Sequence, residues 1–322
     1  MTTSTSPTTS PSTIAVVGAG AVGSYYGALL ARAGHRVTLI ARAPHVAAVR
    51  ERGLLLHKGG SVETVRLNAS TEVAAVHGAD LVLCCVKSTD TEAVAREMRP
   101  HLDRDALVLS LQNGVDNAPA LAAVLANTVL AAAVYVATAM PEPGVVQHFG
   151  RGDLVIGPLD AAAASDPAVA RRLQRVVALM AGADVPVTVS PDVRTELWRK
   201  LLVNCAYNAI SALAQQPYGR MAAQPDVVQL QRTLVHEVVA VAQAEGVALS
   251  LTEAMDTVSR LAGAMPAQFS STAQDMARGK RSEIDHLNGT VVRLGARHGI
   301  AVPANEALYA LVKLVESARQ AP

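Results

Sequence analysis

A row of polar side chains runs through the apolar segment 196–210. Glu196, Lys200, Asn204 and Asn208 recur at every fourth position, so on an α-helix they share one face that drifts slowly around the axis. The rest of the segment is apolar nearly all round, which predicts a buried helix whose polar row faces something polar. A lysine there can act as a general acid towards a carbonyl oxygen, and asparagines can donate to an oxyanion or carboxylate. The same row also fits a purely structural role, as a polar seam between two domains in which Lys200 pairs with Glu196.

A glycine-rich motif near the amino terminus predicts a dinucleotide-binding loop. It lies between a β-branched run and an Ala- and Leu-rich helical segment, and consists of Gly18, Ala19, Gly20, Ala21, Val22 and Gly23. The first glycine allows a tight turn, the second lets the backbone approach a pyrophosphate, and the third lets the helix pack on the strand. Free N–H groups at the helix N-terminus then face the anion.

The end of the second strand indicates which dinucleotide is bound. NAD sites usually carry an acid there for the ribose 2′-hydroxyl, but here Ile40 is followed by Ala41 and Arg42, with no acid before Glu51. A guanidinium forks onto phosphate oxygens and keeps its charge, so Arg42 favours NADP(H) over NAD(H). A solvated surface arginine is the alternative reading.

The elements that must position these residues follow two patterns. Short β-branched runs at 14–17, 36–40, 80–86, 106–109 and from 129 alternate with helical segments. This alternation predicts a sheet with a parallel core, covered on both faces, in an α/β Rossmann-type domain. Nearly everything after residue 191 has helical spacing. We therefore expect a disordered tail at 1–12, a Rossmann domain at 13–190 and an all-α domain at 191–322.

Composition excludes several classes of function. The chain has 28 Lys and Arg against 27 Asp and Glu, and only 3% aromatic residues, which argues against a nucleic-acid partner. The longest apolar stretch, 129–140, is too short to cross a membrane. Three cysteines, no signal peptide and no metal-ligand spacing predict a cytoplasmic protein without a disulfide framework or a metal site. The sequence leaves open whether the protein forms a homodimer.

Several motifs together resemble the ketopantoate reductase (2-dehydropantoate 2-reductase) family, from about residue 13 to 316. Besides the glycine loop and the Lys200 helix, they are Cys85-Val86-Lys87, Gln112-Asn113-Gly114, the run from Ser270 to Asp275, and the E-I-D-x-x-N-G segment from Glu283 to Gly289. The resemblance implies an N-terminal Rossmann domain, a helical C-terminal domain like that of 6-phosphogluconate dehydrogenase, and an active site in the cleft between them.

The resemblance also implies a role for each matching residue and favours catalysis for Lys200, as the general acid. The implied cofactor contacts are the glycine loop, Arg42, Lys87, Asn113, Ala137 and Glu283. The implied substrate contacts are Asn113, Lys200, Asn204, Asn208 and Ser271, with Ser270 as a helix cap. The implied reaction is the NADPH-dependent reduction of a small 2-keto acid, 2-dehydropantoate to (R)-pantoate.

Two departures from the family pattern concern the substrate. Tyr218 stands where several family members have an asparagine after a proline, and Gln268 stands where the family often has an asparagine. They leave open a reductase or D-2-hydroxyacid dehydrogenase acting on a different 2-keto acid, and they give Tyr218 either a packing or a pocket role. An NADP-binding sensor without turnover is a further alternative.

Overall fold

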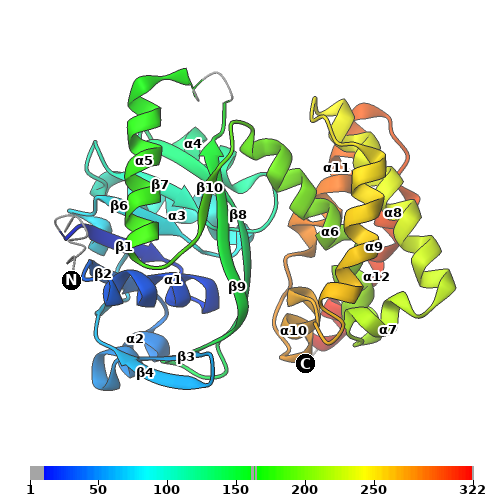
Figure 1. Ribbon diagram of the computed structural model, residues 1–322. Helices are drawn as coiled ribbons and strands as arrows, with labels where there is room; N and C mark the ends of the chain where they lie inside the picture. Colours follow the sequence, from blue (N-terminus) through cyan, green and yellow to red (C-terminus); the bar gives the residue numbers. More distant parts are fainter. Residues whose placement is uncertain (1–10, 161–162, 164, 321–322) are drawn as a thin grey trace, which may run out of the picture. The chain divides into compact units, whose positions relative to one another are not determined.

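Contacts within the chain divide it into two units. The computed structural model describes residues 11–160, 163 and 165–320. Unit 1 extends to Gln112 and resumes from Ala118 to Pro191, and unit 2 comprises residues 113–117 and everything from Asp192 onwards (Figure 1). The five-residue segment 113–117 therefore leaves the sheet of unit 1 and packs within the helical unit.

The described strands of unit 1 form one sheet of ten strands, in the order β4-β3-β9-β8-β7-β6-β1-β2-β5, with β10 beside β9. The strands are β1 (Thr13–Val17), β2 (Arg36–Ile40), β3 (Leu54–Lys58), β4 (Ser61–Val65), β5 (Asn68–Ser70), β6 (Leu81–Cys84), β7 (Leu107–Ser110), β8 (Thr128–Ala139), β9 (Val145–Pro158) and β10 (Val187–Val189). From β8 to β5 every neighbouring pair is parallel. Since β2 and β6 flank β1, the order reverses at β1, which is where open α/β sheets bind ligands.

Helices cover both faces of this sheet, as the right-handed crossovers on either side of β1 require (Figure 1). The α-helices of unit 1 are α1 (Ala21–Arg32), α2 (Ala43–Arg52), α3 (Thr91–Met98), α4 (Asn117–Val124) and α5 (Pro167–Gly182), and its 3-10 turns are η1 (Val73–Val76), η2 (Ser88–Asp90) and η3 (Arg99–His101). Helix α1 packs so closely on the sheet that a Cβ on Gly27 would lie 2.7 Å from Leu39 Cδ2. The fully buried β-strand residues Val16, Leu39 and Leu83 belong to the core of this unit. The predicted Rossmann-type domain is thus confirmed.

The sheet is mixed, because antiparallel pairs adjoin its predicted parallel core. Strands β8 and β9 pair antiparallel, as do β3 and β4. The turn from Pro141 to Gly144 joins β8 to β9 directly, and so short a connection can only reverse the chain. Strands β3 to β5 and helix α2 lie in the segment 43–70, for which no element was predicted.

Most of the predicted amino-terminal tail, residues 1–10, lies outside the described residues. Ser12 at its end is buried, which corrects the predicted extent of the tail. Its N–H donates to His35 Nδ1 (3.3 Å) and its carbonyl oxygen accepts from Arg36 N–H (3.0 Å). These bonds fasten the chain to the start of β2, one residue before β1 begins.

The regular secondary structure of unit 2 is helical in its described residues, as predicted. Its helices are α6 (Val193–Ala214), α7 (Tyr218–Ala222), α8 (Pro225–Ala244), α9 (Leu251–Ala264), α10 (Ser271–Ala277), the 3-10 turn η5 (Ile284–His286), α11 (Asn288–His298) and α12 (Pro303–Gln320). Helix α6 begins where the Asp192 carboxylate accepts from Thr195 N–H (3.1 Å) and Oγ1 (2.6 Å). Such a cap stabilises a helix by about 1 kcal/mol. Trp198, Tyr207 and Leu234 lie in the core of this unit.

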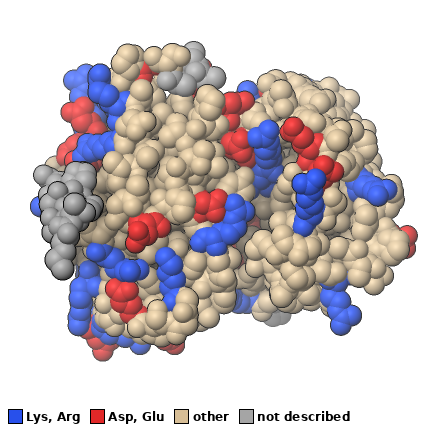
Figure 2. All heavy atoms as spheres, viewed as in Figure 1, with Lys and Arg blue, Asp and Glu red and all other residues tan. Residues whose placement is uncertain are grey.

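Charges of both signs are interspersed on the face of each unit that Figure 2 shows, without a continuous field of one sign. Among the described residues, no helix is both long and apolar enough to cross a membrane, and no group of His, Cys, Asp or Glu side chains could hold a metal ion.

Candidate active site

The glycine loop joins β1 to α1 and is held against two neighbouring strands. The N–H groups of Gly18 and Ala19 both donate to the Ile40 carbonyl oxygen (3.0 Å each) at the end of β2. Gly18 has a φ of +80°, and a Cβ there would lie 2.5 Å from Val86 N. In contrast, a Cβ on the exposed Gly20 would meet only Gly18 O, at 3.9 Å. The first glycine is therefore required by the fold, whereas the second leaves open space in front of the helix N-terminus.

Two exposed cations follow the strands on either side of this loop. Arg42 lies two residues beyond β2 and is the N-terminal cap residue of α2. Lys87 lies three residues beyond β6 and precedes η2. Because β1 pairs with both strands in parallel, Val17 opposite Ile40 and Cys84, the two cations lie at the same carboxyl edge as the loop. This edge can hold an anionic nucleotide through cationic side chains and helix N–H groups.

Ala137 lies near the far end of β8, which continues beyond the last residue of its parallel partner β7. The pairing with β7 ends at Ser110 and Ala131, and from there to Ala139 the strand pairs only with β9. The register between β8 and β9 shifts between Ala137 and Thr138. Ala137 itself is half-buried.

A buried histidine that sequence reasoning missed is connected to the glycine loop by hydrogen bonds. His45 Nδ1 accepts from Gly144 N–H (2.9 Å), so its Nε2 carries the proton and donates to Ser24 Oγ (3.2 Å). The Ser24 hydroxyl in turn donates to the Ala19 carbonyl oxygen (3.2 Å). Burial lowers the pKa of His45, which keeps this neutral tautomer. The partners lie up to 99 residues apart, so local spacing carried no signal for this chain of bonds.

The polar row of the sequence lies on α6 of unit 2 and becomes more buried along the helix. Glu196, Lys200 and Asn204 are half-buried, and Asn208 is only 2% exposed. Glu196 Oε1 accepts from Arg199 Nη1 (2.6 Å). The structure thus places a lysine between an acid that is engaged by an arginine and two asparagine amides one and two turns further on.

Helix α10 packs against α6 beside the last residue of this row. Ser270 caps α10 by accepting from Ala273 N–H (3.0 Å), and its hydroxyl is 3.2 Å from the Asn208 carbonyl oxygen, to which it donates. Its N–H donates to Ser211 Oγ (3.3 Å). These bonds fix the start of α10, and the next residue, Ser271, is exposed. Asn208 and the first turn of α10 are therefore brought together.

The two departures from the family pattern are neighbours in space. Tyr218 N–H donates to the Gln268 carbonyl oxygen (2.9 Å). The Tyr218 ring is buried against Tyr207, with ring centroids 4.6 Å apart. Burial raises the pKa of the Tyr218 hydroxyl. Of the two roles left open for Tyr218, the structure shows the packing one.

Glu283 and Asn113 meet in unit 2, although 170 residues separate them. Asn113 Nδ2 donates to Glu283 Oε2 (3.4 Å). Gly114, next along the chain, has a φ of +91°, and a Cβ there would lie 3.0 Å from the His286 carbonyl oxygen. The positive φ and the close approach of the His286 carbonyl oxygen therefore favour glycine where the segment 113–117 lies against η5.

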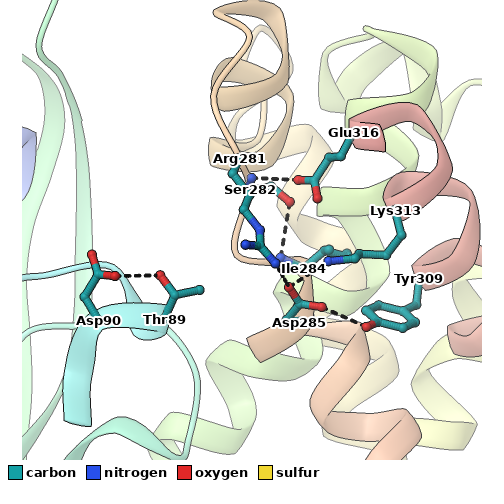
Figure 3. Close-up of polar contacts among 9 residues, drawn as sticks. All are labelled: Thr89, Asp90, Arg281, Ser282, Ile284, Asp285, Tyr309, Lys313 and Glu316. Carbon is teal, nitrogen blue, oxygen red and sulfur yellow. Dashed lines mark hydrogen bonds and ion pairs between the residues drawn. The ribbon is translucent and has the colours of Figure 1, made fainter. Parts of the chain in front are cut away.

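Helix α12 holds the segment around Glu283 through three side chains on one face (Figure 3). Tyr309 Oη donates to Asp285 Oδ1 (2.7 Å), Lys313 Nζ donates to Asp285 Oδ2 (3.0 Å), and Glu316 Oε1 accepts from Ser282 N–H (2.7 Å). Burial pushes the pKa of Asp285 upwards, but the bonds from Tyr309 and Lys313 outweigh it and hold this pKa below its ordinary value. The chain on either side of Glu283 is thus anchored.

Both parts of the chain match models of known protein families. The family model for the ketopantoate reductase PanE/ApbA matches residues 14–161, and that for the ketopantoate reductase PanE/ApbA C terminal matches residues 192–316. The chain is 37% identical to a 2-dehydropantoate 2-reductase of Halobacterium salinarum, over 94% of this chain and 98% of that protein. It is 34% identical to a 2-dehydropantoate 2-reductase of Vibrio cholerae, over 94% and 97%.

Solved structures share the fold over nearly the whole chain. A PanE/ApbA family ketopantoate reductase from Ralstonia eutropha superposes with a TM-score of 0.89 at 52% identity, covering 96% of this chain and 100% of that one. A D-mandelate dehydrogenase with NADH and anilino(oxo)acetate has the same TM-score at 23% identity, which shows a common fold. The two matching domains and the full-length relatives establish that this chain belongs to the ketopantoate reductase family.

Proposed function

We propose that this protein reduces 2-dehydropantoate to (R)-pantoate with NADPH. Membership of the ketopantoate reductase family supports an oxidoreductase acting on a keto acid. The observation that carries the finer assignment is the α6 row, in which Lys200 is followed by Asn204 and Asn208 on one face. It combines a proton donor with neutral hydrogen-bond donors, as the reduction of an anionic keto acid requires.

The carboxyl edge of the unit 1 sheet suits a nicotinamide dinucleotide. The open space at Gly20 would admit the pyrophosphate, and the first turn of α1 would bind it through N–H groups. Arg42 would bind a ribose 2′-phosphate, and within the described residues its guanidinium makes no hydrogen bond or ion pair that would compete. Lys87, Asn113, Ala137 and Glu283 complete the proposed cofactor contacts.

In the proposed reaction, Lys200 supplies the proton. NADPH, when bound, would supply a hydride to the ketone carbon. Asn204, Asn208 and Ser271 would hold the keto acid through its carboxylate and carbonyl oxygens. The Lys200 ammonium would donate one proton to the carbonyl oxygen as negative charge develops there, leaving a neutral amine that regains a proton from water. Asn113 would contribute to both cofactor and substrate binding.

Replacing Lys200 by alanine tests this assignment. We expect kcat with 2-dehydropantoate to fall by at least about 100-fold, since general acid catalysis contributes roughly that much. Arg199→Ala is the matched control, because it removes the adjacent cation of the same helix, which is exposed and bound to Glu196 and Glu253. A Lys200→Ala rate within tenfold of the parent would overturn the general-acid role.

Replacing Arg42 by alanine tests the choice of NADPH over NADH. We expect the KM for NADPH to rise at least tenfold while the KM for NADH changes less than twofold, since only NADPH carries the 2′-phosphate. Arg52→Ala, at the other end of α2, should leave both values unchanged. Equal losses for the two cofactors would refute the phosphate contact.

A second candidate is the same reaction on a different 2-keto acid. It is favoured by the departures from the family pattern at Tyr218 and Gln268, where no family asparagine stands. Ranking 2-keto acids by kcat/KM with NADPH separates the candidates, and 2-dehydropantoate should rank first. NADPH binding without oxidation by any keto acid would instead favour a sensor.

A further inference from the structure

A buried glutamine amide clamps the loop that carries Lys87. Gln112 follows β7, is 5% exposed and lies at the end of unit 1. Its Nε2 donates to the Val86 carbonyl oxygen (3.1 Å) and to Thr91 Oγ1 (2.7 Å), and its Oε1 accepts from Ser110 Oγ (3.0 Å). One amide group thus holds both ends of the stretch 87–90.

The orientation of this amide is fixed by chemistry. The Val86 carbonyl oxygen can only accept a hydrogen bond, so the nitrogen of Gln112 must face it. The hydroxyl of Ser110 then donates to the amide oxygen. Because the amide is buried, each of these partners is costly to lose. The loop is therefore held in one conformation by a specific donor pattern rather than by side-chain volume.

We infer that Gln112 is a positioning residue for Lys87. This inference rests on the proposed function, in which the exposed Lys87 binds the nucleotide at the carboxyl edge of the sheet. Val86 also lies against Gly18, so the clamped loop sets the distance between the Lys87 backbone and the glycine loop. Fixing the lysine before binding lowers the conformational entropy that nucleotide binding would otherwise lose.

Substitutions at Thr91 and Gln112, the two side chains joined by one bond of the clamp, test the inference. Thr91→Val removes one acceptor of the amide at nearly constant volume, whereas Thr91→Ser retains the hydroxyl. Gln112→Glu replaces the donor that faces the Val86 carbonyl oxygen by a carboxylate oxygen. We expect Thr91→Val and Gln112→Glu to weaken NADPH binding about three- to tenfold, measured by fluorescence titration of the full chain, and Thr91→Ser to bind like the parent.

A double-mutant cycle with Lys87→Met separates positioning from a general loss of structure. If Gln112 acts through Lys87, Thr91→Val and Gln112→Glu should change the Kd less than twofold in the Lys87→Met background. Asn127→Asp is the matched control, because that amide also donates to main-chain carbonyl oxygens, those of Asp103 and Ala106, at the opposite edge of the sheet. It should leave the NADPH Kd unchanged.

The remaining outcomes separate a failure of the positioning role from a failure of the cofactor role of Lys87. Equal effects of Thr91→Val in both backgrounds, or a parental Kd for Gln112→Glu, would overturn the positioning role while leaving the proposed function intact. A parental Kd for Lys87→Met itself would refute the cofactor role of Lys87, and the positioning role would fall with it.

Discussion

Two glycines of one loop serve different purposes, and their surroundings distinguish them. Gly18 has a positive φ and lies directly against the backbone of Val86, so the fold itself excludes a side chain there. Gly20 has an ordinary φ of −80° and open space where its Cβ would point. Only a ligand would exclude a side chain at this second position. Substitution of Gly18 therefore tests a requirement of the fold, and substitution of Gly20 tests a requirement of ligand binding.

Alanine at each of these glycines should give opposite results. We expect Gly18→Ala to lower the free energy of unfolding by at least about 1–2 kcal/mol, from the left-handed backbone alone. Gly20→Ala should cost less than about 1 kcal/mol, the typical range for a cap position, yet weaken NADPH binding at least tenfold. Thermal denaturation and NADPH titration of both variants measure the two quantities. A normal NADPH affinity for Gly20→Ala would contradict the proposed placement of the pyrophosphate.

The residues that sequence reasoning found are those whose signal is local. The glycine loop and the α6 row each show their spacing within a few residues, and periodicity is enough to assign such elements. His45, in contrast, acts through partners up to 99 residues away, and the bonds from Gln112 to the Lys87 loop reach up to 26 residues along the chain. Nothing near His45 in the sequence marks it, and the motif that contains Gln112 does not reveal these bonds, because only the folded chain brings the partners together.

At the scale of elements, the same distinction explains the hairpin of β8 and β9. Alternating strands and helices predicted the parallel centre of the sheet correctly, but β9 follows β8 after one short turn. Its pairing depends on that turn and not on strand composition. In unit 2, helix α12 contributes a side chain at each successive turn, Tyr309, Lys313 and Glu316, to hold the segment 281–286 (Figure 3). A helix remote in sequence thus orders the segment that carries Glu283.

Removing one of these contacts should loosen the segment without unfolding the unit. Tyr309→Phe deletes the hydroxyl that donates to Asp285, and a hydrogen bond to a carboxylate contributes about 1.5–3 kcal/mol. We expect faster amide hydrogen exchange in residues 281–287 and a rise in the pKa of Asp285, which that bond keeps low. Tyr207→Phe removes a tyrosine hydrogen bond of the same length, to the neutral Val258 carbonyl oxygen (2.7 Å), elsewhere in unit 2. This control should leave exchange in 281–287 unchanged, and equal effects of both variants would contradict the clamp.

At the scale of the whole molecule, stability against acid should depend on different groups in different pH ranges. Burial lowers the pKa of His35 and His45 in unit 1, so both bind protons more weakly in the folded state than in the unfolded chain. Their contribution is complete above the unfolded value of about 6.5 and is lost as pH falls from there through the folded pKa. For Asp80, Glu245 and Asp285, whose pKa values are also lowered, the loss begins only near pH 4.

Replacing His45 by asparagine isolates the first of these ranges. Asparagine can still accept from Gly144 N–H through Oδ1 but cannot be protonated, so it lacks the pH-dependent contribution of the histidine. We expect the parent to be more stable than the variant at pH 7.5, and we expect this difference in stability to shrink as pH falls from 7.5 to 5. The reason is that His45 binds a proton in the unfolded parent at a higher pH than in the folded parent. His35 is present in both proteins and cancels from the comparison. Amide hydrogen exchange in the strands of unit 1 follows the stability of that unit across the pH range. The single tryptophan, Trp198, is buried in α6 and reports unit 2 by fluorescence, where parent and variant should agree at every pH. A stability difference that stays constant over this range would show that His45 is not held neutral by its burial.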